Sequence, residues 1–379
     1  MSRRAILLVL VSASACHAPF VTAPHAPLPL LDPHDGVVLA SPQIVTITFP
    51  GYTHRADVEA FGDFVGTSSW LHTVGAEYGV LGASQTAKIV WPTPAPDGLT
   101  DQDLRALLAQ GITDGTLPAP PPSGNELVYV VYWPANVVLD ASSAGAGVLC
   151  LRGSFHSAGG LFTAGYHESA PAPGGGRVPY AVVGDCDDSV DEITTTASRE
   201  LIGCATNPYE VDLSGYLLDT AADDPWLMNL DNGEAGYMCE RETATREGAY
   251  ALHRSWSNAA ARAGQAPCVP ADPTDVYANV SASPAQIVEA TAGTTVSWTI
   301  TGWSTAATDA WTLRTAKPDG SDFRVEDLAP VLSKTTIDNG DTVTLTLDVP
   351  ADARSAQYGG LDLLSGDHDR VWPVAFVVK

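Results

Sequence analysis

The stretch ELVYVVYW, from Glu126 to Trp133, decides the architecture of the first part of the chain. Nearly all of its side chains are apolar, and they do not alternate with polar ones. A continuous apolar run of this kind is typical of a strand that is covered on both faces, as in a parallel sheet flanked by helices. We therefore expect this strand near the centre of an α/β sheet.

Segments on both sides of this strand repeat an order of strand and then helix. QIVTITF, Gln43 to Phe49, is a β-branched apolar run, and Arg55 to Tyr78 then places apolar side chains at helical spacing. Ala87 to Trp91 indicates a second strand, and a helix begins at Thr100 with an acidic residue at the capping-box position. Pro179 to Cys186 indicates a further strand. This alternation predicts α/β layering.

Two other segments do not follow the order of strand and then helix. Gly145 to Gly176 is rich in Gly and Ser, so we expect a long irregular excursion there. Thr245 to Ala263 places its apolar residues at helical spacing and therefore predicts a helix.

The composition changes near the end of this part. Residues 269–275 are rich in Pro, Asp and Thr, as a linker is, and the segments beyond them alternate apolar and polar residues at short intervals. Such alternation predicts an antiparallel β-sandwich, which would be immunoglobulin-like. The expected organisation is a signal peptide (1–15), a tether or surface peptide (16–40), an α/β domain (41–268), a linker (269–275) and a sandwich domain (276–379).

The N-terminus indicates export. A short basic segment precedes the apolar run Ala5 to Val11, and small residues lead to Cys16. This order is typical of a bacterial lipoprotein signal with Cys16 as the lipidated residue. Lipoproteins usually carry Leu where Ala13 stands, so secretory cleavage after Ala15 without a lipid remains the alternative. The apolar run is far shorter than the ~20 residues of a membrane span. We expect a protein of the bacterial cell envelope or the extracellular space, with a lipid at Cys16 as its only membrane contact.

The charge balance narrows the classes of partner. The chain has 19 Lys and Arg against 44 Asp and Glu, which gives a formal net charge of -25. An acidic surface of this kind repels phosphate backbones and acidic lipid headgroups. Nucleic acid is therefore not an expected partner.

The chain has six cysteines, and an exported chain with several cysteines is expected to form disulfides. We predict the pairs Cys150–Cys186 and Cys239–Cys268, although spacing alone leaves other pairings open. Cys204 is the expected unpaired residue because it lies inside a predicted helix. It is either a small buried hydrophobe or a nucleophile beside a histidine.

The stretch TTTASRELIGCATNP, Thr194 to Pro208, has the length and the Asn-Pro end of a zinc-protease helix. Such a helix carries two His residues at i and i+4, which hold one ion, and a Glu at i+1, which polarises the bound water. The segment Ser198 to Pro208 resembles the signature S-H-E-x-x-E-x-x-T-D-P of a family of bacterial secreted proteins. That family is distantly similar to the EXORDIUM-like, phosphate-induced proteins of plants. Further matches run in the same order over about Pro42 to Cys268: AEYGV (Ala76 to Val80), VVYWP (Val130 to Pro134), GYH (Gly165 to His167) and NGEAGYMC (Asn232 to Cys239).

The resemblance implies a metzincin-like α/β fold, a helix that carries the metal ligands and a sandwich appended after it. At the positions of the family's ligands this sequence differs. Arg199 stands in place of the His, Gly203 in place of the second ligand Glu, and Asn207 in place of the Asp before Pro. Glu200, which would be the general base, is retained.

These differences change the chemistry of the site. Arginine is always cationic and has no lone pair for a metal, and glycine has no side chain. His167, Glu234 and Glu240 are the remaining candidate ligands, and none of them lies on the helix. We therefore expect no zinc at the family's position and no other cofactor. We predict instead that the Arg199 guanidinium takes the place of the metal and pairs with a carboxylate such as Glu200, Glu234 or Glu240.

Two functions follow from this interpretation. The first is a non-catalytic envelope protein, a pseudoenzyme that binds a protein, peptide or glycan ligand or has a structural role. The second is an active metal-dependent hydrolase or peptidase in which His167 and loop carboxylates hold zinc at a non-standard site.

Two further groups of residues have alternative interpretations. The acidic stretch GDCDDSVDE, Gly184 to Glu192, suits either the N-terminus of the helix that follows or a calcium site. Four tryptophans of the sandwich form either part of its core or an aromatic platform for glycans: Trp298, Trp303, Trp311 and Trp372.

Overall fold

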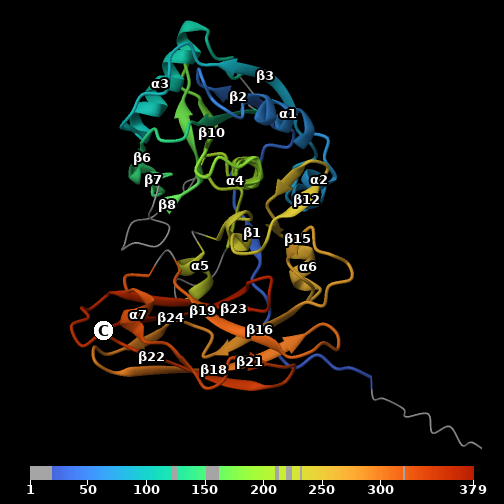
Figure 1. The fold of residues 1–379 in the computed structure, drawn as a ribbon, viewed down its shortest axis with the longest axis vertical. Coiled ribbons are helices and arrows are strands. Elements are labelled where there is room, and N and C mark those ends of the chain that lie inside the picture. Colours follow the sequence, from blue (N-terminus) through green and yellow to red (C-terminus); the bar gives the residue numbers. More distant parts are fainter. Residues whose placement is uncertain are drawn as a thin grey trace, which may run out of the picture.

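The computed structural model is a mixed α/β protein in which strands outweigh helices (Figure 1). It describes residues 19–121, 126–150, 162–209, 213–218, 224–230, 233–318 and 321–379. The expected signal peptide and the expected lipidation residue Cys16 lie outside the described residues. Within the described residues, no helix combines the length and the apolar character that a membrane crossing requires.

The first unit is built on one five-stranded sheet. The strand order is β3-β2-β5-β10-β9, and the expected central strand is confirmed because β5 lies in the middle with every residue buried. Four strands are parallel, and β9 pairs antiparallel with β10 at the edge. The strands are β2 (Gln43–Thr48), β3 (Ser84–Val90), β5 (Leu127–Trp133), β9 (Gly165–Pro171) and β10 (Arg177–Gly184).

Helices cover both faces of this sheet, which explains the unbroken apolar run of β5. Side chains alternate across a strand, so Val128 and Val130 pack with the helices of one face, while Tyr129 and Val131 pack with the helix of the other. Three helices cover the first face and α3 covers the second (Figure 1). The helices are α1 (Arg55–Val65), α2 (Ser69–Gly75), α3 (Asp101–Asp114) and α4 (Val190–Thr206).

The predicted capping box at Thr100 is confirmed. The Thr100 hydroxyl accepts a hydrogen bond from the Asp103 N–H, and the Asp103 carboxylate accepts one from the Thr100 N–H. By contrast, the single helix expected over Arg55 to Tyr78 is wrong. It is broken at Ser68, whose extended backbone and hydroxyl cap α2, and the stretch ends in a short 3-10 turn, η1 (Ala76–Tyr78).

The irregular excursion expected over Gly145 to Gly176 is wrong in its described part. Residues 165–171 form strand β9, because β10 offers a free edge whose backbone groups need partners. Residues 151–161 lie outside the described residues. A small sheet and a 3-10 turn lie beside this region: β4 (Leu99–Thr100), β6 (Leu139–Ala141), β7 (Gly147–Leu149), β8 (Phe162–Thr163) and η2 (Ser142–Ala144).

The helix expected over Thr245 to Ala263 is also wrong. A turn at Gly248, with φ of +60°, folds this stretch into a hairpin instead. Its Glu247 carboxylate accepts hydrogen bonds from the Ser69 and Trp70 N–H groups at the start of α2, so tertiary contacts outweigh the helical spacing. The observed elements are β12 (Thr245–Glu247), β13 (Tyr250–Leu252), β14 (Ser255–Trp256) and the short helix α6 (Asn258–Arg262).

The second unit contains two sheets that share one apolar core. Their pairings are antiparallel except that β17 runs parallel to β24. The four tryptophans of this unit are all buried, which confirms the core interpretation rather than the glycan platform. One sheet has β16 (Ala278–Ser283), β18 (Thr295–Ser304), β22 (Thr342–Asp348) and β20 (Val331–Leu332). The other has β17 (Val288–Ala290), β24 (Arg370–Val378), β23 (Tyr358–Ser365), β19 (Trp311–Ala316) and β21 (Thr336–Ile337), and α7 (Val325–Leu328) lies beside them.

The two units are joined by more than a linker. Trp226, on α5 (Pro225–Asn229), packs against both Trp256 and Trp372, and Arg241 pairs with Asp362 of the sandwich at 2.9 Å. The three tryptophans belong to the same apolar cluster as the core of the sandwich. The remaining short elements lie in this region: β11 (Tyr216–Leu218), η4 (Tyr237–Cys239) and β15 (Cys268–Val269).

Residues 19–40 are not a free tether but a peptide that runs over both units. Strand β1 (Leu31–Pro33) pairs with β11, and the Asn258 side chain bonds both backbone groups of Leu31. Further along the same peptide, the His25 ring stacks on Trp303 at 3.6 Å. This segment therefore reinforces the junction.

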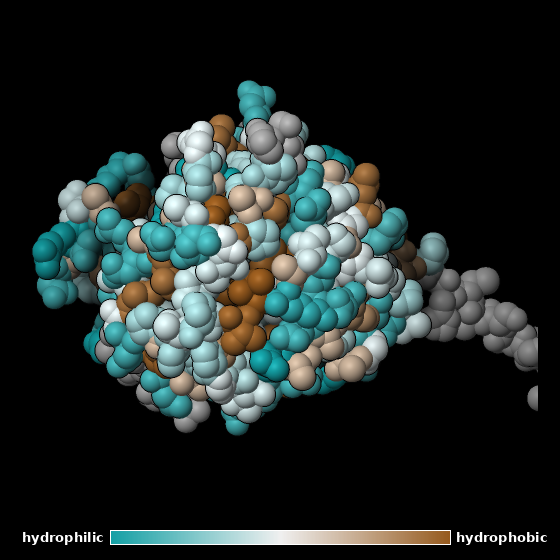
Figure 2. Space-filling view, turned by 90° about the horizontal axis from the view of Figure 1, so that it is seen from above, coloured by the Kyte–Doolittle hydropathy of each residue, from teal (hydrophilic) through white to brown (hydrophobic). Residues whose placement is uncertain are grey.

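The surface at the far end of the first unit is mostly hydrophilic. Viewed from the end opposite the sandwich, hydrophilic residues cover most of the surface and apolar residues form small separate areas (Figure 2).

Candidate functional site

The helix expected over Thr194 to Pro208 is present as α4, which begins earlier, at Val190, and ends at Thr206. The Ser189 hydroxyl caps the helix by accepting a hydrogen bond from the Glu192 N–H, and Asp191 and Glu192 occupy the first turn. Negative side chains are favourable there because the helix N-terminus carries partial positive charge. This geometry supports the capping interpretation of that end of the acidic stretch.

Arg199 points inward from α4. Its side chain is only 15% exposed, and its Nε and Nη2 lie 2.9 Å and 2.8 Å from Oε1 of Glu200. Nη2 also donates to the Gly165 carbonyl of β9, and the guanidinium lies over the Tyr237 ring. Burial alone would lower the pKa of Arg199, but Glu200, Tyr237 and Glu240 outweigh it and hold the pKa above its usual value. The guanidinium is thus a permanent buried cation.

Glu200 is fully buried, and its carboxylate is contacted by three side chains. Besides Arg199, its Oε2 lies 3.1 Å from Nδ1 of His167 and accepts a hydrogen bond from the Tyr237 hydroxyl at 3.2 Å. Burial raises the pKa of the Glu200 carboxyl, but Arg199 and His167 outweigh that effect and keep the pKa below its usual value. Glu200 is therefore held as a carboxylate.

His167, on β9, lies between two carboxylates. Its Nδ1 faces Glu200, and its Nε2 lies 3.3 Å from Oε2 of Glu234. The structure thus brings His167 and Glu234 to Glu200, and Glu240 acts on Arg199 through its charge.

The His167 ring also occupies the space beside Gly203. A Cβ on Gly203 would lie 2.5 Å from Cε1 of His167, far inside van der Waals contact. A glutamate at this position, as the family pattern has it, requires His167 to move. Asn207 has a different role, since it ends α4 and its Oδ1 accepts a hydrogen bond from the Tyr216 N–H.

A second histidine beside α4 was missed by the sequence analysis. His253 is buried, and its backbone N–H donates to the Ser198 hydroxyl. Burial, followed by the charge of Arg199, lowers the pKa of His253 to about 3. The ring is therefore neutral, and no feature of the sequence marked it.

The predicted disulfides Cys150–Cys186 and Cys239–Cys268 are confirmed. Their presence is compatible with a secreted or envelope protein. Cys204 is fully buried in the apolar core between α4 and the sheet. This position suits a small hydrophobe rather than a nucleophile.

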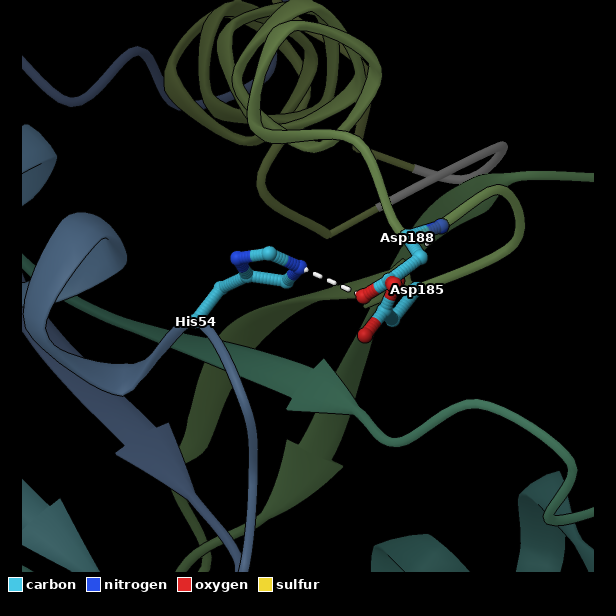
Figure 3. A group of neighbouring side chains, drawn as sticks. All are labelled: His54, Asp185 and Asp188. Carbon is cyan, nitrogen blue, oxygen red and sulfur yellow. Dashed lines mark hydrogen bonds and ion pairs between the residues drawn. The ribbon is translucent and has the colours of Figure 1, made fainter.

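A second group lies at another edge of the unit. His54, Asp185 and Asp188 each offer one ligand atom, and these atoms lie within 4.8 Å of one another (Figure 3). It is the only such group of His, Cys, Asp and Glu within the residues that the structure describes. The calcium interpretation of Gly184 to Glu192 includes the two aspartates but not His54, which is distant in sequence.

Comparison of the chain with protein-family models and with curated protein sequences finds no match. The function is therefore argued from the geometry of these two groups.

Proposed function

We propose that the chain is an exported, non-catalytic protein of the bacterial cell envelope whose metallopeptidase-like domain has lost its zinc site. In this proposal the domain is a pseudoenzyme that serves as a binding or structural module, with a protein, a peptide or a glycan as its ligand. The sequence resemblance of Ser198 to Pro208 to the secreted zincin-like family supports the ancestry.

One observation carries the proposal. The Arg199 guanidinium lies 2.8 Å from the Glu200 carboxylate, inside the protein, where the family pattern expects a histidine ligand and a catalytic base. A guanidinium has no lone pair, and it repels a divalent cation. The position of the first metal ligand is therefore taken by a group that excludes the metal.

The state of Glu200 supports the same conclusion. A general base works best when its pKa lies near the operating pH. The pKa of Glu200 is instead held below its usual value by Arg199 and His167, against the effect of burial. A carboxylate that already accepts from Arg199, His167 and Tyr237 is a weak base.

The hydrolase alternative has less geometric support. It requires His167 and loop carboxylates to hold one zinc ion. Glu200 and Glu234 lie at different nitrogens of the His167 ring, at 3.1 Å and 3.3 Å, so an ion bound by one nitrogen has only one of these carboxylates beside it. Zinc sites of catalytic type use three protein ligands.

A peptidase assay tests the proposal. Tag-free mature chain, with and without added Zn²⁺, is incubated with casein and a fluorogenic peptide library. The matched control is Glu200→Gln, which keeps the shape of the side chain and removes the base. We expect no difference between the two proteins. Hydrolysis that is present in the parent, absent in Glu200→Gln and inhibited by a chelator would contradict the proposal.

A reconstructed site tests the ancestry. Because a glutamate at position 203 requires the space of the imidazole, Arg199→His and Gly203→Glu are combined with His167→Ser. We expect this triple variant to bind one more zinc equivalent than the control with Gly203→Glu and His167→Ser alone. An equal zinc content in both proteins would argue against a former metal site on α4.

A further inference from the structure

We propose that His54, Asp185 and Asp188 form a binding site for a divalent transition-metal ion of the Zn²⁺ class. The site is separate from the Arg199–Glu200 pair, and it goes beyond the function proposed above. The His54 Nε2 lies 2.9 Å from Oδ1 of Asp188, and Asp185 lies beside both (Figure 3).

The place of this group in the fold suits a ligand. His54 follows β2, and both aspartates follow β10, so the three residues lie where parallel strands of one sheet end. In open α/β sheets, ligands bind outside the carboxyl ends of the strands. The Asp185 N–H donates to the Trp133 carbonyl at the end of β5, which lies between these strands. The group therefore lies across the carboxyl ends of β2, β5 and β10.

The loop that carries the aspartates is held in place. Cys186 follows Asp185 directly and is bonded to Cys150. Asp188 has a φ of +55°, a conformation that few residue types other than Gly, Asn and Asp adopt readily, and its N–H donates to Oδ1 of Asp185. The backbone of the loop is therefore held in place, while the Asp188 side chain stays largely exposed.

A buried hydroxyl beside the group is the independent observation. Tyr52 is only 6% exposed, and its hydroxyl has no hydrogen-bond partner in the described part of the chain. Its ring is edge-on to the His54 ring, with 6.4 Å between the ring centroids. A buried hydroxyl without a partner is costly. A water molecule on an ion held by the three residues would supply that partner.

The donor set selects the class of ion. One imidazole nitrogen with two carboxylate oxygens suits Zn²⁺ and similar transition ions, which use three protein ligands and a water. Calcium prefers six to eight oxygen ligands, which disfavours the calcium interpretation of this stretch. Donor atoms around one zinc ion lie about 3.3 Å apart, so a small inward movement closes the site. Asp188 is exposed and free to make that movement.

Zinc titration of the metal-stripped, tag-free chain tests the proposal. Isothermal calorimetry is expected to show one equivalent of Zn²⁺ bound, with an affinity at least about tenfold weaker in His54→Gln and in Asp188→Asn. Tyr52→Phe removes only the hydroxyl. It is expected to weaken zinc binding about tenfold while leaving the metal-free melting temperature unchanged or raised.

Two controls locate the ion. His368→Gln removes a surface histidine that also faces an aspartate, Asp275 at 3.4 Å, and Glu200→Gln changes the buried site on α4. Both are expected to retain full zinc affinity. The proposal is overturned by equal zinc binding in the parent, His54→Gln and Asp188→Asn, by the absence of saturable binding, or by a preference for Ca²⁺. Loss of zinc binding in the Glu200→Gln variant alone would place the ion on α4 and contradict both proposals.

Discussion

The group around Arg199 and Glu200 and the group of His54, Asp185 and Asp188 differ in how their negative charges are balanced by positive ones. Around α4, the buried Arg199 pairs with Glu200, and His167 lies between Glu200 and Glu234. At the sheet edge, three carboxylates lie near His54, those of Asp57, Asp185 and Asp188, and Asp188 is largely exposed. A buried group must carry its own counter-charges because water cannot supply them, whereas an exposed one is free to take an ion from solution. The comparison teaches that a buried charge on α4 and an exposed one at the sheet edge find their counter-charges in different ways.

The largest expected effect comes from breaking the buried pair. Arg199→Met keeps most of the packing of the stem but leaves Glu200 buried without its main counter-charge, which typically costs about 3–5 kcal/mol. Urea unfolding measures this change. Glu200→Gln in the same chain is expected to recover much of the loss.

The matched control is the exposed pair of Lys334 with Asp341. Lys334→Met should have a much smaller effect than Arg199→Met, because solvent screens that pair. Equal effects would show that the Arg199 pair is not buried in solution.

Acidification is the next test. The folded pKa of His253 is lowered to about 3, below its unfolded value, so the unfolded state binds a proton first as the pH falls. Unfolding free energy should therefore fall below about pH 6.5 by up to about 1.4 kcal/mol per pH unit. The lowered pKa of Glu200 adds a further loss at lower pH, since its stabilisation requires the ionised form.

His253→Gln separates these contributions. It should flatten the pH dependence of the unfolding free energy between about pH 6.5 and 4.5, where Glu200 stays ionised. The measurement is a series of urea titrations across this range. An unchanged slope would show that the His253 ring is not buried as a neutral group.

A smaller effect is expected from filling the space beside His167. Gly203→Ala places a Cβ 2.5 Å from the ring, and such overpacking costs about 1–3 kcal/mol. Gly82→Ala is the control, because its Cβ would meet only one neighbour, at 3.9 Å. If both variants melt at the same temperature, the imidazole does not occupy the space that a ligand side chain would need.

The smallest effect is expected at the sheet edge without metal. Asp188→Asn should change the unfolding free energy of the stripped protein by less than about 0.5 kcal/mol, because the side chain is exposed and Asn tolerates the same backbone conformation. Differential scanning calorimetry with and without Zn²⁺ measures both states. A large loss without metal would mean that the group is structural.

The sequence predicted those elements whose signals are local. The apolar run of β5, the capping box at Thr100 and the helix over Thr194 to Pro208 depend on neighbouring residues, and all three are confirmed. Strand β9 was missed because its stability comes from the free edge of β10. The helix expected over Thr245 to Ala263 was wrong because Glu247 has its partners on α2.

The candidate site was predictable only in part. The chemistry of a guanidinium indicated that Arg199 would pair with a carboxylate, and Glu200 is that carboxylate. The fit of the His167 ring to Gly203 could not be predicted, because it depends on how β9 packs against α4. His54 joins Asp185 and Asp188 only through the order of strands in the sheet, which no local pattern encodes.

Anomalous diffraction from crystals grown with Zn²⁺ tests the central contrast most directly. The account predicts a zinc peak bound by His54, Asp185 and Asp188, with the Arg199 guanidinium still against Glu200. A peak bound by Glu200 and His167, with Arg199 displaced, would contradict it.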